Sequence, residues 1–278
     1  MKKFTLFSLV MLSAALAFTS CSKELDPGQV RTKEVAVSLA TRLPSAPQSR
    51  AVTEQVADIE GYHLRYILEI WTSGDKPELD KRIVKEADAD KTTSFDVTLL
   101  SGRTFDFLLW ADYAEDGGNE DMHYTTVNGL KEVSRSEKTY ITDEQHDYEL
   151  AATRDAFSAH KQVTADAPIN ETITLTRAVA QLNIFTTDYE QVEESFRPAY
   201  TGLTITTAAD FNVLTGTSFG SATSDLRSYV AVKTEKEGAA PDKNKVFTGY
   251  YFTSSEGKNV VDMDVHFYRA DNSEVVTY

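Results

Sequence analysis

The sequence predicts an all-β protein built from antiparallel β-sandwiches, with few and short helices. Apolar residues recur at every second position along many short segments, which is the spacing of a strand with one buried face. Turn-forming residues separate these segments, and helical periodicity is scarce. Many strands joined by polar turns, with few helices between them, are typical of antiparallel sandwiches.

Four strands are predicted in the first half of the chain. Three of them show alternating apolar residues, at 34–43, 64–70 and 95–99. The fourth, at 104–110, is almost continuously apolar, as expected for a strand covered on both faces. Trp71 and Trp110 belong to these apolar segments, so we expect both in the core.

A second group of strands follows, and the length of 278 residues suggests two domains. These strands are expected near Ile173 and Leu175 and at 179–185, 203–205, 211–213, 230–232, 246–252 and 261–267. The segment 165–176, which contains Pro168, is the predicted boundary, so the domains are expected at 34–172 and 173–278. Short helices are expected only at 54–60 and 143–146. A turn at 271–273 leads into residues 274–278, which have the pattern of the first part of a returning strand. We therefore expect the second domain to be incomplete.

The first 21 residues have the pattern of a secretion signal that ends in a lipidation site. Lys2 and Lys3 precede an apolar run at 4–18, and small residues then lead to Cys21. Cys21 is the only cysteine of the chain, so it cannot form an internal disulfide. The pattern resembles the bacterial lipobox, which predicts a signal peptide at 1–20, acylation of Cys21 and a membrane anchor; a free thiol after ordinary cleavage is the alternative. Residues 21–33 are polar and turn-rich and are expected to form a flexible tether.

The charge of the chain excludes one class of partner. The formal net charge is −15, and it becomes −17 when Lys2 and Lys3 leave with the signal peptide. A chain this acidic is repelled by nucleic acid, so no nucleic-acid partner is expected. The acidic surface is interpreted as a solubility feature outside the cell, with an acidic face for a cationic partner as the alternative.

No catalytic or metal site is expected. Residues 216–220 match the G-x-S-x-G pattern of serine hydrolases, but Ser218 lacks the alternation of strand and helix that surrounds a nucleophile elbow. The five histidines have no metal-ligand spacing. The acidic residues at 115–121 lack the alternating spacing of a calcium loop, so we interpret them as a solvated loop. We therefore expect a protein that is not an enzyme and that carries no cofactor.

Tyr250 and Tyr251 are the candidate residues for sugar binding. They are adjacent in a predicted strand, so one of the two rings is expected to face outwards, where a tyrosine row can stack on sugar rings.

Four strings resemble the fimbrillin-like lipoproteins of Bacteroidetes, a group that includes major and minor fimbrial subunits. They are RYILEIW at 65–71, FDFLLWADY at 105–113, RDAF at 154–157 and LTRAVAQLNIF at 175–185. The last is the most specific, because in that family a leucine, a basic residue and an apolar run lead into a Q-L-N strand at the entry to the second domain. The resemblance covers most of the chain after the signal peptide, and it lies in strand patterns and not in a catalytic signature.

The resemblance implies two transthyretin-like β-sandwich domains and assembly by strand exchange. In polymerising members, proteolysis after a basic residue removes the first strand, and a strand from the next subunit fills the groove. Here the covering strand would be 34–43, with Val35, Val37 and Leu39 on its buried face. Arg50 is the better candidate for the cleavage site and Arg42 the other, with an ordinary loop arginine as the alternative. Glu24 and Asp26 resemble a signal for display on the outer face of the outer membrane.

Together these observations predict a surface-anchored outer-membrane lipoprotein that acts in cell adhesion or fimbrial assembly. Its expected partners are the membrane, through the lipid, and other fimbrial subunits or ligands on host or bacterial surfaces. An anchor, tip or accessory subunit is favoured over a stalk subunit, because the donor end is expected to be missing. The alternative is a monomeric glycan-binding lipoprotein for nutrient capture.

Overall fold

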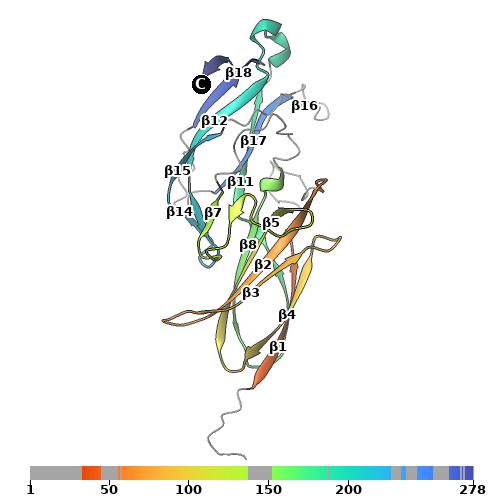
Figure 1. Cartoon of the computed structure of the whole chain (residues 1–278), viewed down its shortest axis with the longest axis vertical. Helices are drawn as coiled ribbons and strands as arrows, with labels where there is room; N and C mark the ends of the chain where they lie inside the picture. The colour runs from red at the N-terminus through yellow and green to blue at the C-terminus, as the bar shows by residue number, and fades with distance from the viewer. Residues whose placement is uncertain are drawn as a thin grey trace, which may run out of the picture. The chain divides into compact units, whose positions relative to one another are not determined.

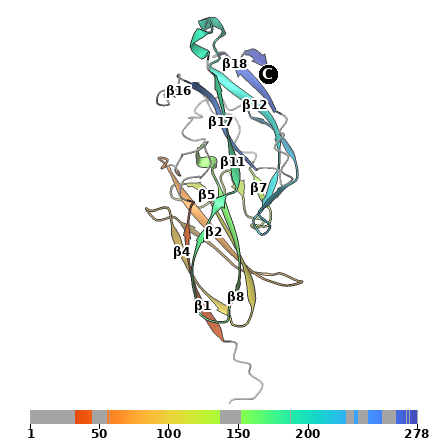
Figure 2. The same cartoon turned by 180° about the vertical axis from the view of Figure 1, so that it is seen from behind.

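The structure is a computed structural model and confirms the all-β prediction (Figures 1 and 2). It describes residues 33–44, 56, 58–136, 152–186, 188–226, 233–235, 243–252, 263–269, 271 and 273–277. The signal peptide, Cys21, Arg50, the helix expected at 143–146 and the strand expected at 230–232 lie outside these residues. Of the helix expected at 54–60, residues 56 and 58–60 are described and are not helical, so that prediction is wrong for them. In the described part, the helical elements η3 (Tyr189–Gln191) and η4 (Glu194–Phe196) are single short turns.

Eight strands between residues 34 and 177 form two sheets. The three-stranded sheet has the order β4-β1-β9, and the five-stranded sheet has the order β10-β8-β5-β2-β3. Their strands are β1 (Glu34–Arg42), β2 (Tyr62–Thr72), β3 (Leu79–Glu86), β4 (Thr93–Leu100), β5 (Thr104–Glu115), β8 (Phe157–Thr164), β9 (Ile169–Thr174) and β10 (Thr176–Arg177). The pairings are antiparallel except for β1 with β9, which is parallel.

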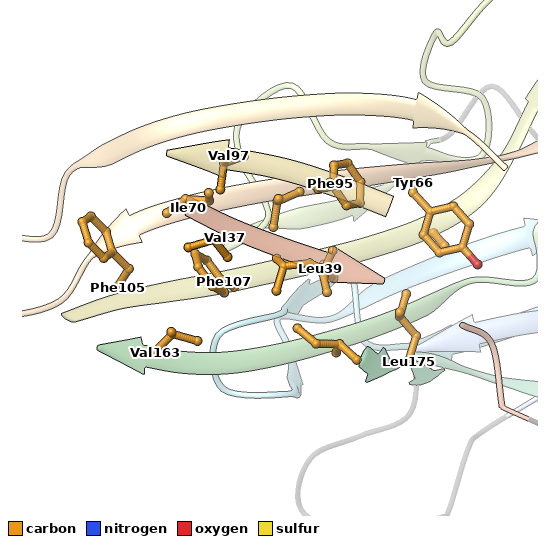
Figure 3. Packing of buried hydrophobic residues seen from close by; sticks show 14 of the residues in the cluster. Val37, Leu39, Tyr66, Ile70, Phe95, Val97, Phe105, Phe107, Val163 and Leu175 are labelled. Atoms are coloured by element: carbon orange, nitrogen blue, oxygen red, sulfur yellow. The ribbon is translucent and has the colours of Figure 1, made fainter. Parts of the chain in front are cut away.

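The two sheets face each other across one hydrophobic core (Figure 3). Each strand contributes alternate residues, as period-two patterns predict. The three-stranded sheet contributes Val35, Val37 and Leu39 from β1 and Phe95, Val97 and Leu99 from β4. The five-stranded sheet contributes Leu64, Tyr66, Leu68 and Ile70 from β2 and Phe105, Phe107 and Leu109 from β5.

The other eleven strands form three further sheets. Their orders are β11-β17-β16, β15-β12-β18-β19 and β14-β13-β7-β6. The strands are β6 (Tyr124–Thr125), β7 (Val133–Arg135), β11 (Val179–Thr186), β12 (Tyr200–Thr207), β13 (Asp210–Asn212), β14 (Thr217–Phe219), β15 (Ala222–Leu226), β16 (Lys233–Glu235), β17 (Lys243–Phe252), β18 (Met263–Tyr268) and β19 (Glu274–Thr277). The expected final strand is therefore present as β19, paired with β18.

A second core covers the outer face of the five-stranded sheet. Ile67, Leu108 and Trp110 project from that face and pack with Phe211 of β13 and Phe252 of β17. Because β2 and β5 bury both of their faces, β5 is almost continuously buried, as its composition predicts. The indole of Trp110 lies 6.0 Å from the ring of Phe211 and 6.5 Å from that of Phe252, measured between centroids.

The expected boundary between residues 172 and 173 lies inside β9. Ile173 and Leu175, predicted to open the second domain, pack in the first core instead. The reason is that β9 pairs with β1, which the local pattern of residues 169–174 does not reveal. The division into two domains stays a prediction.

Candidate functional site

The predicted covering strand, β1, lies inside its sheet and has a neighbour on each side. It runs antiparallel to β4, with Val37 opposite Val97, and parallel to β9, with Val37 opposite Ile169. The side chains of Val35, Val37 and Leu39 point into the core and are 2%, 1% and 0% exposed. The buried face is thus the one that the alternation predicts.

Removing β1 would leave two unpaired strand edges. Neighbouring strands are about 4.8 Å apart, so β4 and β9 would face each other across roughly 10 Å, the width that one strand fills. The floor of this groove would be the apolar core of the opposite sheet (Figure 3). Unpaired backbone edges of this kind readily accept another strand.

Hydrogen bonds fix both ends of β1. At its start, the backbone N–H of Ser101 donates to the carbonyl oxygen of Lys33 at 2.7 Å. At its end, the N–H of Leu175 donates to the carbonyl of Arg42 at 2.9 Å, and Nε of Arg42 donates to Oγ1 of Thr174 at 2.8 Å. Arg42, the second cleavage candidate, is therefore held at the end of a strand. Cleavage after Arg50 stays a prediction.

The residues just before β2 are tied to the rest of the fold by apolar packing and by Lys91. Val56 and Ile59 pack against the first core. Lys91 donates from its ammonium group to the carbonyl oxygen of Val56 and lies 3.0 Å from Oδ1 of Asp58. These contacts would remain if the chain were cut upstream of them.

The outer face of the five-stranded sheet carries a buried ion pair that sequence analysis missed. Nε and Nη2 of Arg65 donate to the two carboxylate oxygens of Asp112 at 2.7 and 3.0 Å. Nη2 also donates to Oδ1 of Asp121 at 2.8 Å. The acidic segment 115–121, which we expect to be a solvated loop, is therefore solvated only in part, because Asp121 binds Arg65. An arginine among the apolar residues of RYILEIW was the available signal, because a buried arginine requires carboxylate partners.

The pKa values of the two carboxylates of this group shift in opposite directions. Burial raises the pKa of Asp112, although the charge and hydrogen bonds of Arg65 oppose the shift. Burial acts in the same direction on Asp121, but hydrogen bonds from Thr126 and Arg65 outweigh it and lower the pKa of that carboxyl.

A second buried carboxylate, Glu69, holds the segment that follows. It is 0% exposed and accepts hydrogen bonds from the guanidinium group of Arg82, from Nε1 of Trp71 at 2.9 Å and from the backbone N–H of Leu130 at 2.9 Å. Trp71 packs only at the rim of the second core, so its predicted core position is correct only in part.

Neither tyrosine of the expected sugar-binding pair faces outwards. Tyr250 and Tyr251 are 4% and 5% exposed. Tyr250 packs into the second core, and Tyr251 packs into a third core with Leu203, Ile205 and Phe247. The expectation is wrong because β17 lies between two cores, whereas alternation alone assigns one side of a strand to solvent.

Ser218 lies on β14, in an antiparallel hairpin opposite Phe211 of β13, and is 5% exposed. The nucleophile of a serine hydrolase lies instead on a sharp turn from a strand into a helix. Among the described residues, no cluster of three or more His, Cys, Asp or Glu side chains has an arrangement that holds a metal ion. Within the same residues, no helix has the length and apolar character needed to cross a membrane.

The model of the Family of unknown function (DUF6562) matches residues 27–278. This chain belongs to that family. No curated protein matches the sequence of this DUF6562 protein significantly.

Three solved structures share a distant likeness with this DUF6562 protein. A provisionally assigned polysaccharide-binding protein from Bacteroides thetaiotaomicron is 10% identical, with a TM-score of 0.49 over 87% of this chain and 79% of that one. A provisionally assigned adhesin from the same species is 9% identical, with a TM-score of 0.47 over 88% and 79%. Another, from Bacteroides ovatus, is 10% identical, with a TM-score of 0.45 over 88% and 77%.

Proposed function

We propose that this DUF6562 protein is a surface-anchored lipoprotein of the outer membrane that acts in cell adhesion or fimbrial assembly by β-strand addition. In this proposal it is fimbrillin-like, has two transthyretin-like sandwich domains, is anchored through acylated Cys21 and performs no catalysis. The observation that carries the proposal is the position of β1, an N-terminal strand between two strands that are not paired with each other.

The energetics favour exchange over simple loss of the strand. Burying an aliphatic side chain contributes about 1.5–3 kcal/mol, so Val35, Val37 and Leu39 together stabilise the bound strand by roughly 5–9 kcal/mol. Backbone pairing to β4 and β9 adds to this. A cleaved β1 would therefore remain bound until a strand with the same alternation replaces it, and Arg50 would be the maturation site.

Strand uptake tests the proposal. The full chain is treated with an arginine-specific protease and mixed with a labelled synthetic peptide of residues 33–43, and it is then run on a gel without boiling. The control peptide has the inward and outward residues exchanged, which turns its apolar face towards solvent. We expect the native peptide, and not the control, to remain bound to the protein, and an Arg50→Ala variant to take up less peptide than an Arg42→Ala variant.

A cleaved protein that binds neither peptide, or both equally, would overturn strand exchange. Mass spectrometry of the native N-terminus tests the anchor separately. We expect acyl chains on Cys21 and their loss in a Cys21→Ser variant; an unmodified thiol in the mature protein contradicts the anchor.

A further inference from the structure

One end of the outer face of the five-stranded sheet is partly exposed to solvent, with His160 and Gln162 the most exposed of its residues. At this end Trp71 of β2, Asp106 of β5 and Gln162 of β8 are opposite one another in register. Two strand spacings separate the first from the last, so the row is about 10 Å long, enough for two linked sugar rings. His160 lies one position away on the same face, with 31% of its side chain exposed. We call Trp71, Asp106, His160, Gln162 and Lys131 the Trp71 patch.

Asp106 orients the polar groups of the Trp71 patch. Its Oδ1 lies 2.9 Å from Nε2 of His160 and accepts from Nε2 of Gln162 at 3.2 Å, and its Oδ2 accepts from Oγ of Ser73 at 2.6 Å. Although burial acts in the opposite direction, these hydrogen bonds lower the pKa of Asp106 and keep it ionised. An anchored carboxylate of this kind fixes its neighbours before any ligand arrives.

The Trp71 ring is also held in place. Its Nε1 donates to the buried carboxylate of Glu69, and the ammonium nitrogen of Lys131 lies 3.6 Å from the ring centroid. A rigid aromatic ring at a surface is the usual platform for the C–H face of a sugar. Lysine has a long side chain, so its ammonium group can move from the ring to the edge of a bound ligand.

Several polar groups of the Trp71 patch make no hydrogen bond within the described part of the chain, although one of them, the ammonium group of Lys131, lies over the Trp71 ring. They are the ammonium group of Lys131, Nδ1 of His160 and Oε1 of Gln162. Together they offer donors and acceptors around an aromatic ring, which matches the hydroxyl groups around a sugar.

We propose that the Trp71 patch binds an uncharged oligosaccharide. The sugar ring lies on Trp71, and its hydroxyl groups bind Lys131, His160 and Gln162. An uncharged glycan is favoured because the local charges are matched, Asp106 by Lys131 and Glu69 by Arg82, so the patch has no excess positive charge to bind an acidic sugar. The net charge of −15 repels an acidic sugar as well. The patch lies on the five-stranded sheet and not on β1, so this site is independent of strand exchange.

Binding can be followed through the tryptophan fluorescence of the full chain. Trp110 is fully buried and Trp71 is the other of the two tryptophans, so a bound sugar changes the signal of Trp71. The probes are neutral hexose oligosaccharides of two to six units, with uronate-containing and sialylated oligosaccharides for comparison. We expect a saturable change with a neutral oligosaccharide. In a Trp71→Phe variant, which lacks the reporter, binding is measured by isothermal titration calorimetry and should be lost.

Variants at exposed positions separate binding from folding. Lys131→Ala and Gln162→Ala should each weaken binding about tenfold, the effect of one lost hydrogen bond to a charged or polar group. The matched control is Lys85→Ala, because Lys85 also lies over an aromatic ring, that of Phe95, but away from the patch. If no neutral glycan binds, if only acidic glycans or an unrelated peptide bind, or if Lys131→Ala and Lys85→Ala behave alike, the proposal is overturned.

Discussion

Arg65 and Asp112 form a two-pronged ion pair across neighbouring strands, with 2% and 1% of their side chains exposed. They lie opposite each other on β2 and β5, on the face that carries the second core. Asp121 joins the pair from the following loop, so the ion pair fastens residues 116–121 to the sheet.

The first prediction concerns this pair. Arg65→Ala leaves Asp112 buried without its cation and should destabilise the protein by about 3–5 kcal/mol in urea unfolding. Lys81→Ala is the control, because Lys81 and its partner Asp80 are exposed, and such pairs contribute about 0–1 kcal/mol. Equal effects of the two substitutions would contradict the role assigned to Arg65.

The second prediction concerns the acid sensitivity caused by His123. Burial, with a contribution from Arg154, lowers the pKa of His123 from 6.5 to about 3. The unfolded chain therefore binds a proton that the folded chain does not, and stability should fall as the pH drops from 6.5 towards 3. Each pH unit within this window removes about 1.4 kcal/mol.

A His123→Gln variant tests this effect. Its unfolding free energy should depend less on pH between 6.5 and 3 than that of the wild type. Parallel pH profiles of the two proteins would show that His123 does not titrate in this way.

The third prediction concerns the anchor residue of β1. Leu39 is 0% exposed, so Leu39→Ala should leave a cavity and destabilise the protein by about 2–5 kcal/mol. Ser38→Ala, at the neighbouring position that points away from the core, should change stability by no more than about 0.5 kcal/mol. Thermal unfolding of the full chain measures both, and a tolerated Leu39→Ala would argue against tight seating of β1.

The fourth prediction concerns Gly249 on β17. A Cβ atom there would lie 2.7 Å from Cε2 and 2.8 Å from Cζ of Tyr251, whose ring is buried. Gly249→Ala should therefore displace the ring and destabilise the protein by about 1–3 kcal/mol. Gly118→Ala is the control, because a Cβ there meets nothing within 4 Å. A neutral Gly249→Ala would mean that the third core can rearrange.

The sequence by itself determined the position of many strands and which of their residues share a face, but not β3 or β8. Its period-two alternation predicted the buried face of β1 and the strand nature of β4, β11 and β18, and the continuous apolar run predicted that β5 is covered on both sides. Alternation is a local property, because successive side chains must point to opposite faces whatever the strand later contacts.

Only the tertiary structure decided what covers each face. The burial of both Tyr250 and Tyr251, the closure of Asp121 onto Arg65, the parallel pairing of β9 with β1 and the row from Trp71 to Gln162 all join segments far apart in the chain. Their physical cause is the packing of one sheet on another and the pairing of distant strands. A residue pattern within one strand shows which faces are covered but not which segments cover them.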